Sequence, residues 1–172
     1  MSRIYLNFKN KKYIYMKINF KKLNQQATIP SRSKEGDAGY DMTATDIEIK
    51  DNILTVHTGI AVEIPSGYAG FLFPRSSICK QNQYLTNSVG VLDYNYIGEV
   101  KFKFKFGIGL DTLNKEFHPI IPYNFYEVGD RIGQLIIMPY PNIEFEEVDE
   151  LTSTNRGEGG FGSTGKWISL KK

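Results

Sequence analysis

The chain has few of the residues that form disulfides or structural metal sites. It contains one cysteine, Cys79, and two histidines, His57 and His118, among 172 residues. A single cysteine excludes an internal disulfide, and two isolated histidines provide no Cys/His set at zinc-site spacing. We therefore expect one domain held by its own core in a reducing compartment, with Cys79 as a buried, inert thiol.

Long apolar runs are also missing. No segment reaches the roughly 20 residues that a membrane span needs, and the N-terminus lacks an apolar signal core followed by a cleavage site. We expect a soluble, cytoplasmic protein that does not interact with membranes. Helical periodicity sustained over ten or more residues is equally hard to find.

The charge is unevenly distributed along the chain. Residues 1–34 hold nine Lys or Arg and no acid, whereas the remainder holds twelve bases and nineteen acids. A basic arm of this kind can touch phosphates non-specifically, but a solvated extension is the simpler interpretation, and we expect no specific nucleic-acid binding. We interpret residues 1–15 as an extension before the domain, with Met16 as an alternative start.

Short apolar or alternating segments bounded by Gly, Pro and Asn fill most of the sequence and predict an all-β fold. The predicted strands cover residues 47–49, 54–64, 69–73, 100–106, 132–139 and 143–148, with one helical turn at 76–81. In residues 101–106, Lys and Phe alternate strictly, which predicts three Phe in the core and three Lys in water. Residues 106–128 are long for a simple connection and form either an extended hairpin or a functional loop.

A glycine-rich stretch lies near the end of the chain, at residues 156–165. Taken alone, it is either a flexible linker or a segment whose backbone N–H groups and hydroxyls close over a phosphorylated ligand. We place the β domain at residues 16–150 and a flexible arm at 151–172.

Five short segments carry more polar, glycine-flanked residues than packing requires. They read Asp-Ala-Gly-Tyr-Asp at 37–41, Pro-Arg-Ser-Ser at 74–77, Gly-Val-Leu-Asp-Tyr-Asn-Tyr-Ile-Gly-Glu at 90–99, Gly-Asp-Arg-Ile-Gly-Gln-Leu at 129–135, and Arg-Gly-Glu-Gly-Gly-Phe-Gly-Ser-Thr-Gly at 156–165. Each alone is compatible with an exposed turn. Together, in this order, they resemble the five motifs of the homotrimeric dUTP pyrophosphatases, the dUTPases.

The resemblance implies a jelly-roll-like distorted β-barrel, a homotrimer with three shared active sites, and hydrolysis of dUTP to dUMP and pyrophosphate. Asp93 would be the general base for the attacking water and Gln134 would help to hold that water. Arg75, Ser76 and Ser77 would contact the phosphate chain.

The cofactor that the resemblance implies is Mg²⁺. We expect it to be held by phosphate oxygens and waters rather than directly by the protein, with Asp41 contacting only the waters around the ion.

The resemblance also assigns residues to the base and sugar. Asn87 and Gly90 lie in the hairpin that would read uracil, and Tyr96 would pack under the deoxyribose. The arm would reach another subunit's site, where Phe161 stacks on uracil beside Gly162. The phosphate contacts of the arm would come from Arg156, Ser163 and Thr164.

Three features depart from the usual family pattern. Gly133 stands where alanine is common, Ile97 replaces a frequent arginine, and the 106–128 segment is longer than in compact members. That segment is a candidate surface for a protein partner. Two alternatives to a dUTPase stay open: a dCTP deaminase of the same fold, and a regulator that binds dUTP to control a partner.

Overall fold

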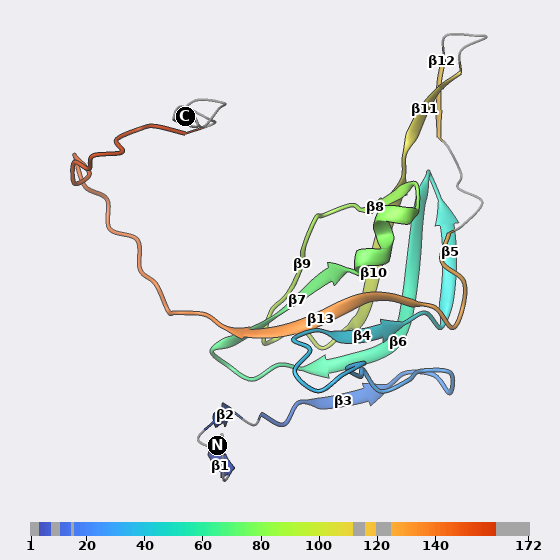
Figure 1. Cartoon of the computed structure of the whole chain (residues 1–172), viewed down its shortest axis with the longest axis horizontal. Coiled ribbons are helices and arrows are strands. Elements are labelled where there is room, and N and C mark those ends of the chain that lie inside the picture. The colour runs from blue at the N-terminus through green and yellow to red at the C-terminus, as the bar shows by residue number, and fades with distance from the viewer. Residues whose placement is uncertain (1–3, 8–10, 15, 112–115, 120–124, 161–172) are drawn as a thin grey trace, which may run out of the picture. The chain divides into compact units, whose positions relative to one another are not determined.

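The computed structural model describes residues 4–7, 11–14, 16–111, 116–119 and 125–160. The chain divides into two units, Met1–Pro141 and Asn142–Lys172. The strands of the first unit are shown in Figure 1. They are β1 (Ile4–Asn7), β2 (Lys11–Ile14), β3 (Asn19–Lys22), β4 (Tyr40–Thr43), β5 (Asp46–Lys50), β6 (Ile53–Glu63), β7 (Tyr68–Pro74), β8 (Gln83–Leu85), β9 (Gly90–Leu92), β10 (Glu99–Phe106), β11 (Ile108–Asp111), β12 (Glu116–Pro119) and β13 (Arg131–Pro139).

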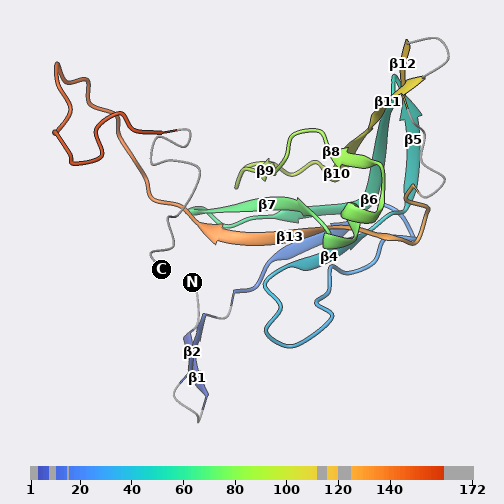
Figure 2. The ribbon, with the colours of Figure 1, turned by 45° about the horizontal axis from the view of Figure 1, so that its top comes forward.

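Two antiparallel sheets carry the core, which confirms the all-β prediction. One follows the order β3-β6-β10-β8, with β5 also on β6, and the other follows β4-β13-β7-β9. Figure 2 shows β4, β13 and β7 side by side. The long strand β6 organises the first sheet, since one of its edges pairs with β10 and the other pairs first with β5 and then with β3.

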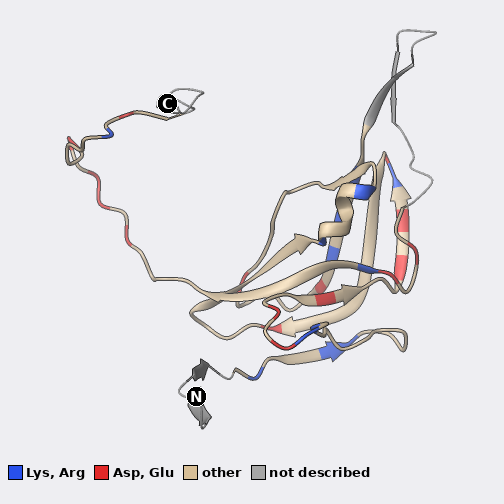
Figure 3. Cartoon of the chain, viewed as in Figure 1, with Lys and Arg blue, Asp and Glu red and all other residues tan. Residues whose placement is uncertain are grey.

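Alternation along β10 places its aromatic rings inside. Phe102, Phe104 and Phe106 are at most 1% exposed, and the Phe102 and Phe104 rings stack at 6.2 Å. Lys101 and Lys103 are exposed. Figure 3 colours the lysine positions along β10 blue. The predicted Phe core is therefore confirmed.

Most predicted strands are confirmed as β5, β6, β7, β10 and β13, and the predicted helical turn is the 3₁₀ helix η1 (Ser76–Lys80). Part of the 106–128 segment forms the hairpin β11-β12, which is one of the two predicted alternatives. Cys79 lies on η1 and is exposed, so its predicted burial is wrong. None of the helical residues described is part of a helix long and apolar enough to cross a membrane.

The predicted strand at 143–148 is wrong. Residues 142–153 of the second unit have no regular structure, although their apolar side chains alternate as in a strand. Ile143, Phe145 and Leu151 are 64%, 92% and 88% exposed. A strand needs a neighbour that accepts its backbone hydrogen bonds, and none is supplied among the described residues of this chain.

Candidate functional site

A buried carboxylate lies where β4 meets β13. Asp41 is 5% exposed and is the cross-strand partner of Gln134. The Gln134 amide donates to Asp41 Oδ1 at 3.2 Å, and Arg75 Nε lies 3.3 Å from the same oxygen. Arg131 donates to Asp41 Oδ2 at 2.9 Å. The structure thus brings together three residues predicted from separate motifs.

The surroundings of Asp41 favour its charged form. Burial by itself would raise the pKa of this carboxyl, but the Gln134 bond and the charges of Arg75 and Arg131 outweigh burial and lower the pKa below its ordinary 3.8. Asp41 therefore stays ionised at neutral pH and orients two guanidinium groups. Arg75 uses its Nε here, so its two terminal nitrogens can still donate to an anion.

A polar cavity of about 300 Å³ adjoins this cluster. Arg75 and Ser77 line it from the start of η1, Asp130 lines it from the turn before β13, and Arg131 lines it as the first residue of β13. Tyr126 also lines it, and its ring packs against Phe104 with centroids 5.0 Å apart. The cavity can accept a small anionic or hydrated group beside the predicted phosphate-binding residues.

The Tyr126 hydroxyl has no hydrogen-bond partner among the described residues, although the side chain is 2% exposed. Burial raises the pKa of this phenol, more than Arg75 and Ser77 lower it, so the hydroxyl keeps its proton. Ser77 is near enough to influence the phenol without meeting hydrogen-bond geometry. A buried hydroxyl without a partner is costly, which marks Tyr126 as a residue the predicted site lacked.

Two of the predicted uracil-binding residues, Asn87 and Gly90, lie just before and at the start of β9. The predicted hairpin is wrong for the described residues, because β9 pairs with β7 while β8 belongs to the other sheet. Ser88 has φ +57°, which turns the chain sharply after the exposed Asn87. Gly90 is buried, and a Cβ there would lie 3.1 Å from Leu72 on the paired strand β7. The small residue therefore lets β9 lie close against β7.

The segment after β9 is a closed turn that carries Asp93 and Tyr96. The Tyr96 N–H donates to the Asp93 carbonyl at 3.0 Å, and the Tyr96 hydroxyl donates to the Glu99 carbonyl at 2.9 Å. Both side chains are exposed, with Tyr96 at 43%. A carboxylate and an aromatic face are thus presented to solvent from one short turn.

Two groups of predicted residues stay separate within one chain. No hydrogen bond or ion pair between described residues joins the Asp93–Tyr96 turn to the Asp41 cluster. Ser76 is exposed on η1, and in the second unit Arg156 donates to the Gly159 carbonyl at 2.9 Å. Phe161, Gly162, Ser163 and Thr164 lie outside the described residues.

The sequence reasoning missed Arg131 and Ser33, which both contact Asp41. Arg131 stood inside a quoted motif without a role, and Ser33 donates to Asp41 Oδ2 at 3.3 Å from the loop before β4. The Arg131 contact depends on the strand register, and the Ser33 contact depends on the path of the loop before β4.

Within the described part of the chain, no three His, Cys, Asp or Glu side chains gather as metal ligands. The two oxygens of Asp41 are already engaged by Arg75, Gln134, Arg131 and Ser33. Because cations and hydrogen-bond donors occupy both oxygens, a water bound to Mg²⁺ can reach Asp41 only by displacing one of them.

Comparisons with known proteins agree with the motif pattern. The dUTPase family model matches residues 25–165. The chain is 40% identical over 140 residues to the deoxyuridine 5'-triphosphate nucleotidohydrolase of Tropheryma whipplei, covering 80% of this chain and 88% of that protein. It is 37% identical to the enzyme of the same name from Clostridium novyi, covering 87% and 99%.

A solved structure shares the fold. The dUTPase of Staphylococcus bacteriophage 80alpha, determined with dUpNHpp, aligns with a TM-score of 0.70 and 29% identity, covering 87% of this chain and 99% of that one.

Proposed function

We propose, since the chain belongs to the dUTPase family, that it hydrolyses dUTP to dUMP and pyrophosphate and so removes dUTP from the precursors of DNA. In the reaction, a water oxygen bonds to the α-phosphorus while the bond to the bridging oxygen of pyrophosphate breaks. The observation that carries the site assignment is the pairing of Arg75, which lines a polar cavity, with the buried Asp41.

Asp93 is the base that takes the proton from the attacking water. Its carboxylate is exposed on a turn closed by the Tyr96 N–H, so an entering nucleotide can meet it without rearrangement of the strand. Gln134 helps to hold the attacking water while its Nε2 stays bonded to Asp41. The backbone hydrogen bond fixes the turn that carries the base, which limits the reorganisation of the chain during the reaction.

The triphosphate is bound by cations and hydroxyls that the fold has already oriented. Arg75 lies at the start of η1 with Ser76 and Ser77 directly after it. Mg²⁺ carried on the triphosphate would neutralise developing charge, and Asp41 would contact only its waters. Such a contact requires Asp41 to release one of its present donors.

Uracil and the deoxyribose are bound by β9, the residues just before it and the turn after it. Asn87 and the backbone around Gly90 read the base edge, and the close approach of this backbone rejects the thymine methyl by clash. Tyr96 packs under the sugar and excludes a 2′-hydroxyl. In the arm, Arg156 clamps the terminal phosphate with Ser163 and Thr164, and Phe161 stacks on uracil beside Gly162.

We further propose a jelly-roll homotrimer with a swapped arm. Within one chain, the Asp93–Tyr96 turn and the Asp41 cluster are not joined by hydrogen bonds or ion pairs between described residues, and one active site can contain both if different copies of the chain contribute them. Exposed apolar side chains support this: Ile97 is 76% exposed, and Phe145 and Leu151 are exposed on a segment that pairs with no strand among the residues that the structure describes. An apolar cavity of about 480 Å³, lined by Ile18, Phe20 and Leu135 among others, offers a second copy's segment a place to dock.

Oligomeric state tests this part of the proposal. Light scattering coupled to gel filtration should give three chains for the wild type, and Phe145→Asp with Leu151→Asp should shift the protein towards monomer. A wild-type monomer with full dUTP turnover would contradict shared sites.

Product analysis tests the reaction. The protein is incubated with Mg²⁺ and, separately, dUTP, dCTP, dTTP and UTP. We expect dUMP and pyrophosphate from dUTP alone, with kcat lowered by about 10²-fold or more in Asp93→Asn, the usual contribution of a general base. Asp51→Asn, an exposed carboxylate in another turn, is the matched control. Deaminated products from dCTP would indicate the deaminase instead.

The arm is tested by truncation after residue 155. The truncated protein should keep its oligomeric state and lose most turnover, because the phosphate clamp and the stacking ring are removed. Undiminished kcat/KM would show that the arm has no part in catalysis.

The regulator alternative stays a prediction. Phage dUTPases, with that of bacteriophage 80alpha as the case studied, control transfer of virulence genes, which is a property of those proteins. The β11-β12 hairpin is the feature of this chain on which a protein partner was predicted.

A further inference from the structure

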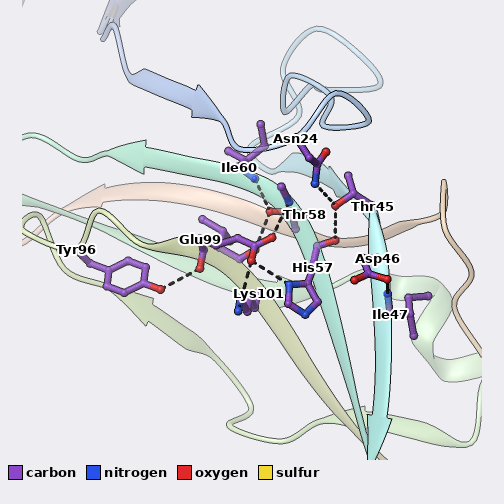
Figure 4. Close-up of polar contacts among 12 residues, drawn as sticks. Asn24, Thr45, Asp46, Ile47, His57, Thr58, Ile60, Tyr96, Glu99 and Lys101 are labelled. Carbon is purple, nitrogen blue, oxygen red and sulfur yellow. Dashed lines mark hydrogen bonds and ion pairs between the residues drawn. The ribbon is translucent and has the colours of Figure 1, made fainter.

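Glu99, the first residue of β10, is bound to β6 through both carboxylate oxygens (Figure 4). Its Oε1 accepts the Gly59 N–H at 2.9 Å, and its Oε2 lies 2.9 Å from His57 Nδ1. Lys101 Nζ lies 3.4 Å from the same oxygen. The Glu99 and His57 side chains are only 18% and 22% exposed. This carboxylate is thus fixed from three sides.

Glu99 lies at an irregularity in the pairing of β10 with β6. The register between β10 and β6 shifts between Glu99 and Lys101, so the regular ladder is interrupted there. At such a bulge, the backbone direction is set by side-chain bonds as well as by ladder bonds. Burial alone would raise the pKa of Glu99, but the bonds from His57 and Gly59 lower it, so the carboxylate stays charged and bound.

Tyr96 is anchored on this same residue. Its hydroxyl donates to the Glu99 carbonyl, and the close-up in Figure 4 shows the ring extending from the turn towards that oxygen. The ring lies against Gly98, where an added Cβ would be 2.6 Å from the tyrosine hydroxyl. The place of the Glu99 backbone therefore decides where the Tyr96 ring lies.

We propose that Glu99 and His57 are positioning residues that set the selectivity for deoxyribose over ribose through Tyr96. The inference rests on the proposed role of Tyr96 under the sugar. A ring excludes a 2′-hydroxyl only if it cannot retreat, and the contacts from β6 to Glu99 and from Glu99 to Tyr96 prevent that retreat. The face of the ring stays open to the ligand because the restraint acts on the hydroxyl.

The test is the ratio of kcat/KM for dUTP to kcat/KM for UTP. Glu99→Ala and Tyr96→Phe should each lower this ratio by about two- to tenfold, the effect of losing one ordinary hydrogen bond. Glu99→Gln, which keeps an acceptor for Gly59, should retain most of the selectivity. If Glu99→Ala fails to fold, the same ratio is measured in His57→Ala. This variant removes the histidine contact and leaves the hydrogen bond from the Gly59 N–H to Glu99 in place.

A double-mutant cycle separates this role from general destabilisation. In the Tyr96→Phe background, Glu99→Ala should lower the ratio no further, because the restraint is already lost. Lys103→Ala, on the same exposed face of β10, is the matched control and should leave the ratio unchanged. An unchanged ratio in Glu99→Ala, or additive losses in the double variant, overturns the proposal.

A wrong assignment of Tyr96 to the deoxyribose would give a different result from a wrong role for Glu99. If Tyr96→Ala leaves the ratio unchanged, Tyr96 is not the sugar platform and the selectivity claim falls with it. A crystal structure of Glu99→Ala then tests whether the Glu99 side chain holds the Tyr96 ring in place. A ring displaced from residue 99 supports this role, and an unmoved ring refutes it.

Discussion

Replacing Gly133 with alanine should destabilise this protein, although the motif it resembles usually has alanine there. Gly133 lies on β13 and is buried against Phe102 of the other sheet. A Cβ at this position would lie 2.1, 2.5 and 2.8 Å from three carbons of the Phe102 ring. The ring fills the volume that a methyl group at residue 133 would occupy.

The size of the effect follows from how little the ring can move. The nearest pair would be about 1.3 Å inside the 3.4 Å at which ordinary contact begins. Phe102 is 0% exposed and is stacked on Phe104 with an interplanar angle of 8°, so a shift is passed on to a second buried ring. Overpacking of this kind costs about 2–3 kcal/mol. For a protein of this length, that loss lowers Tm by roughly 4–12 °C.

Thermal and urea unfolding at one protein concentration measures the loss, since Tm of an oligomer depends on concentration. Phe102→Leu is made alone and together with Gly133→Ala. Because a smaller side chain admits the new methyl, the double variant should be more stable than the summed single effects by about 1 kcal/mol or more. A Gly133→Ala variant as stable as wild type, or strictly additive effects, would refute the packing argument.

Asp41→Asn should lower kcat/KM for dUTP and destabilise the fold by about 1–3 kcal/mol, because the half-exposed Arg131 and the partly exposed Arg75 lose a charged hydrogen-bond acceptor. Kinetics and urea unfolding check the two effects. Since the pKa of Asp41 is lower in the folded protein than its ordinary 3.8, its ion pairs stabilise above that pH, and the contribution should be lost as the pH falls below it. The free energy of unfolding, measured as a function of pH, should therefore fall less steeply on acidification in Asp41→Asn than in the wild type. Tyr126→Phe should leave stability unchanged or raise it by up to about 1 kcal/mol, since it removes a buried hydroxyl without a partner, and a clear loss in Tm would show that the hydroxyl is satisfied.

Strands with strong local patterns could be predicted from sequence because their period reports which face is buried. The Lys-Phe alternation of β10 is the clearest case, since both the strand and its buried face are confirmed. The same rule fails for residues 143–148, where Ile143 and Phe145 alternate with Glu but stay exposed. Alternation predicts a side-chain pattern and says nothing about which strand supplies the hydrogen bonds.

The site was predictable as a set of motifs, whereas its contacts were not. The motifs identified Asp41, Arg75 and Gln134, but the pairing of Asp41 with Arg131 depends on the register of β13 against β4, including an irregularity between Arg131 and Gly133. Register depends on the packing of the whole sheet, and no local pattern encodes it. For the same reason, nothing in the sequence indicated that Glu99 is bound to His57.

The Asp41 cluster is better explained by substrate binding than by stability. Burying a carboxylate with two arginines costs desolvation that their attraction only partly returns, and apolar residues of similar volume often hold a fold as well. In the proposed site the cluster provides orientation, because Arg75 lines the cavity while it is held through Nε and so has less rotamer freedom left to lose on binding. A triphosphate that meets cations already in place loses less free energy to ordering them, which leaves more of the binding energy for the transition state. A buried charge at this position is therefore expected in a chain selected for turnover of an anionic substrate.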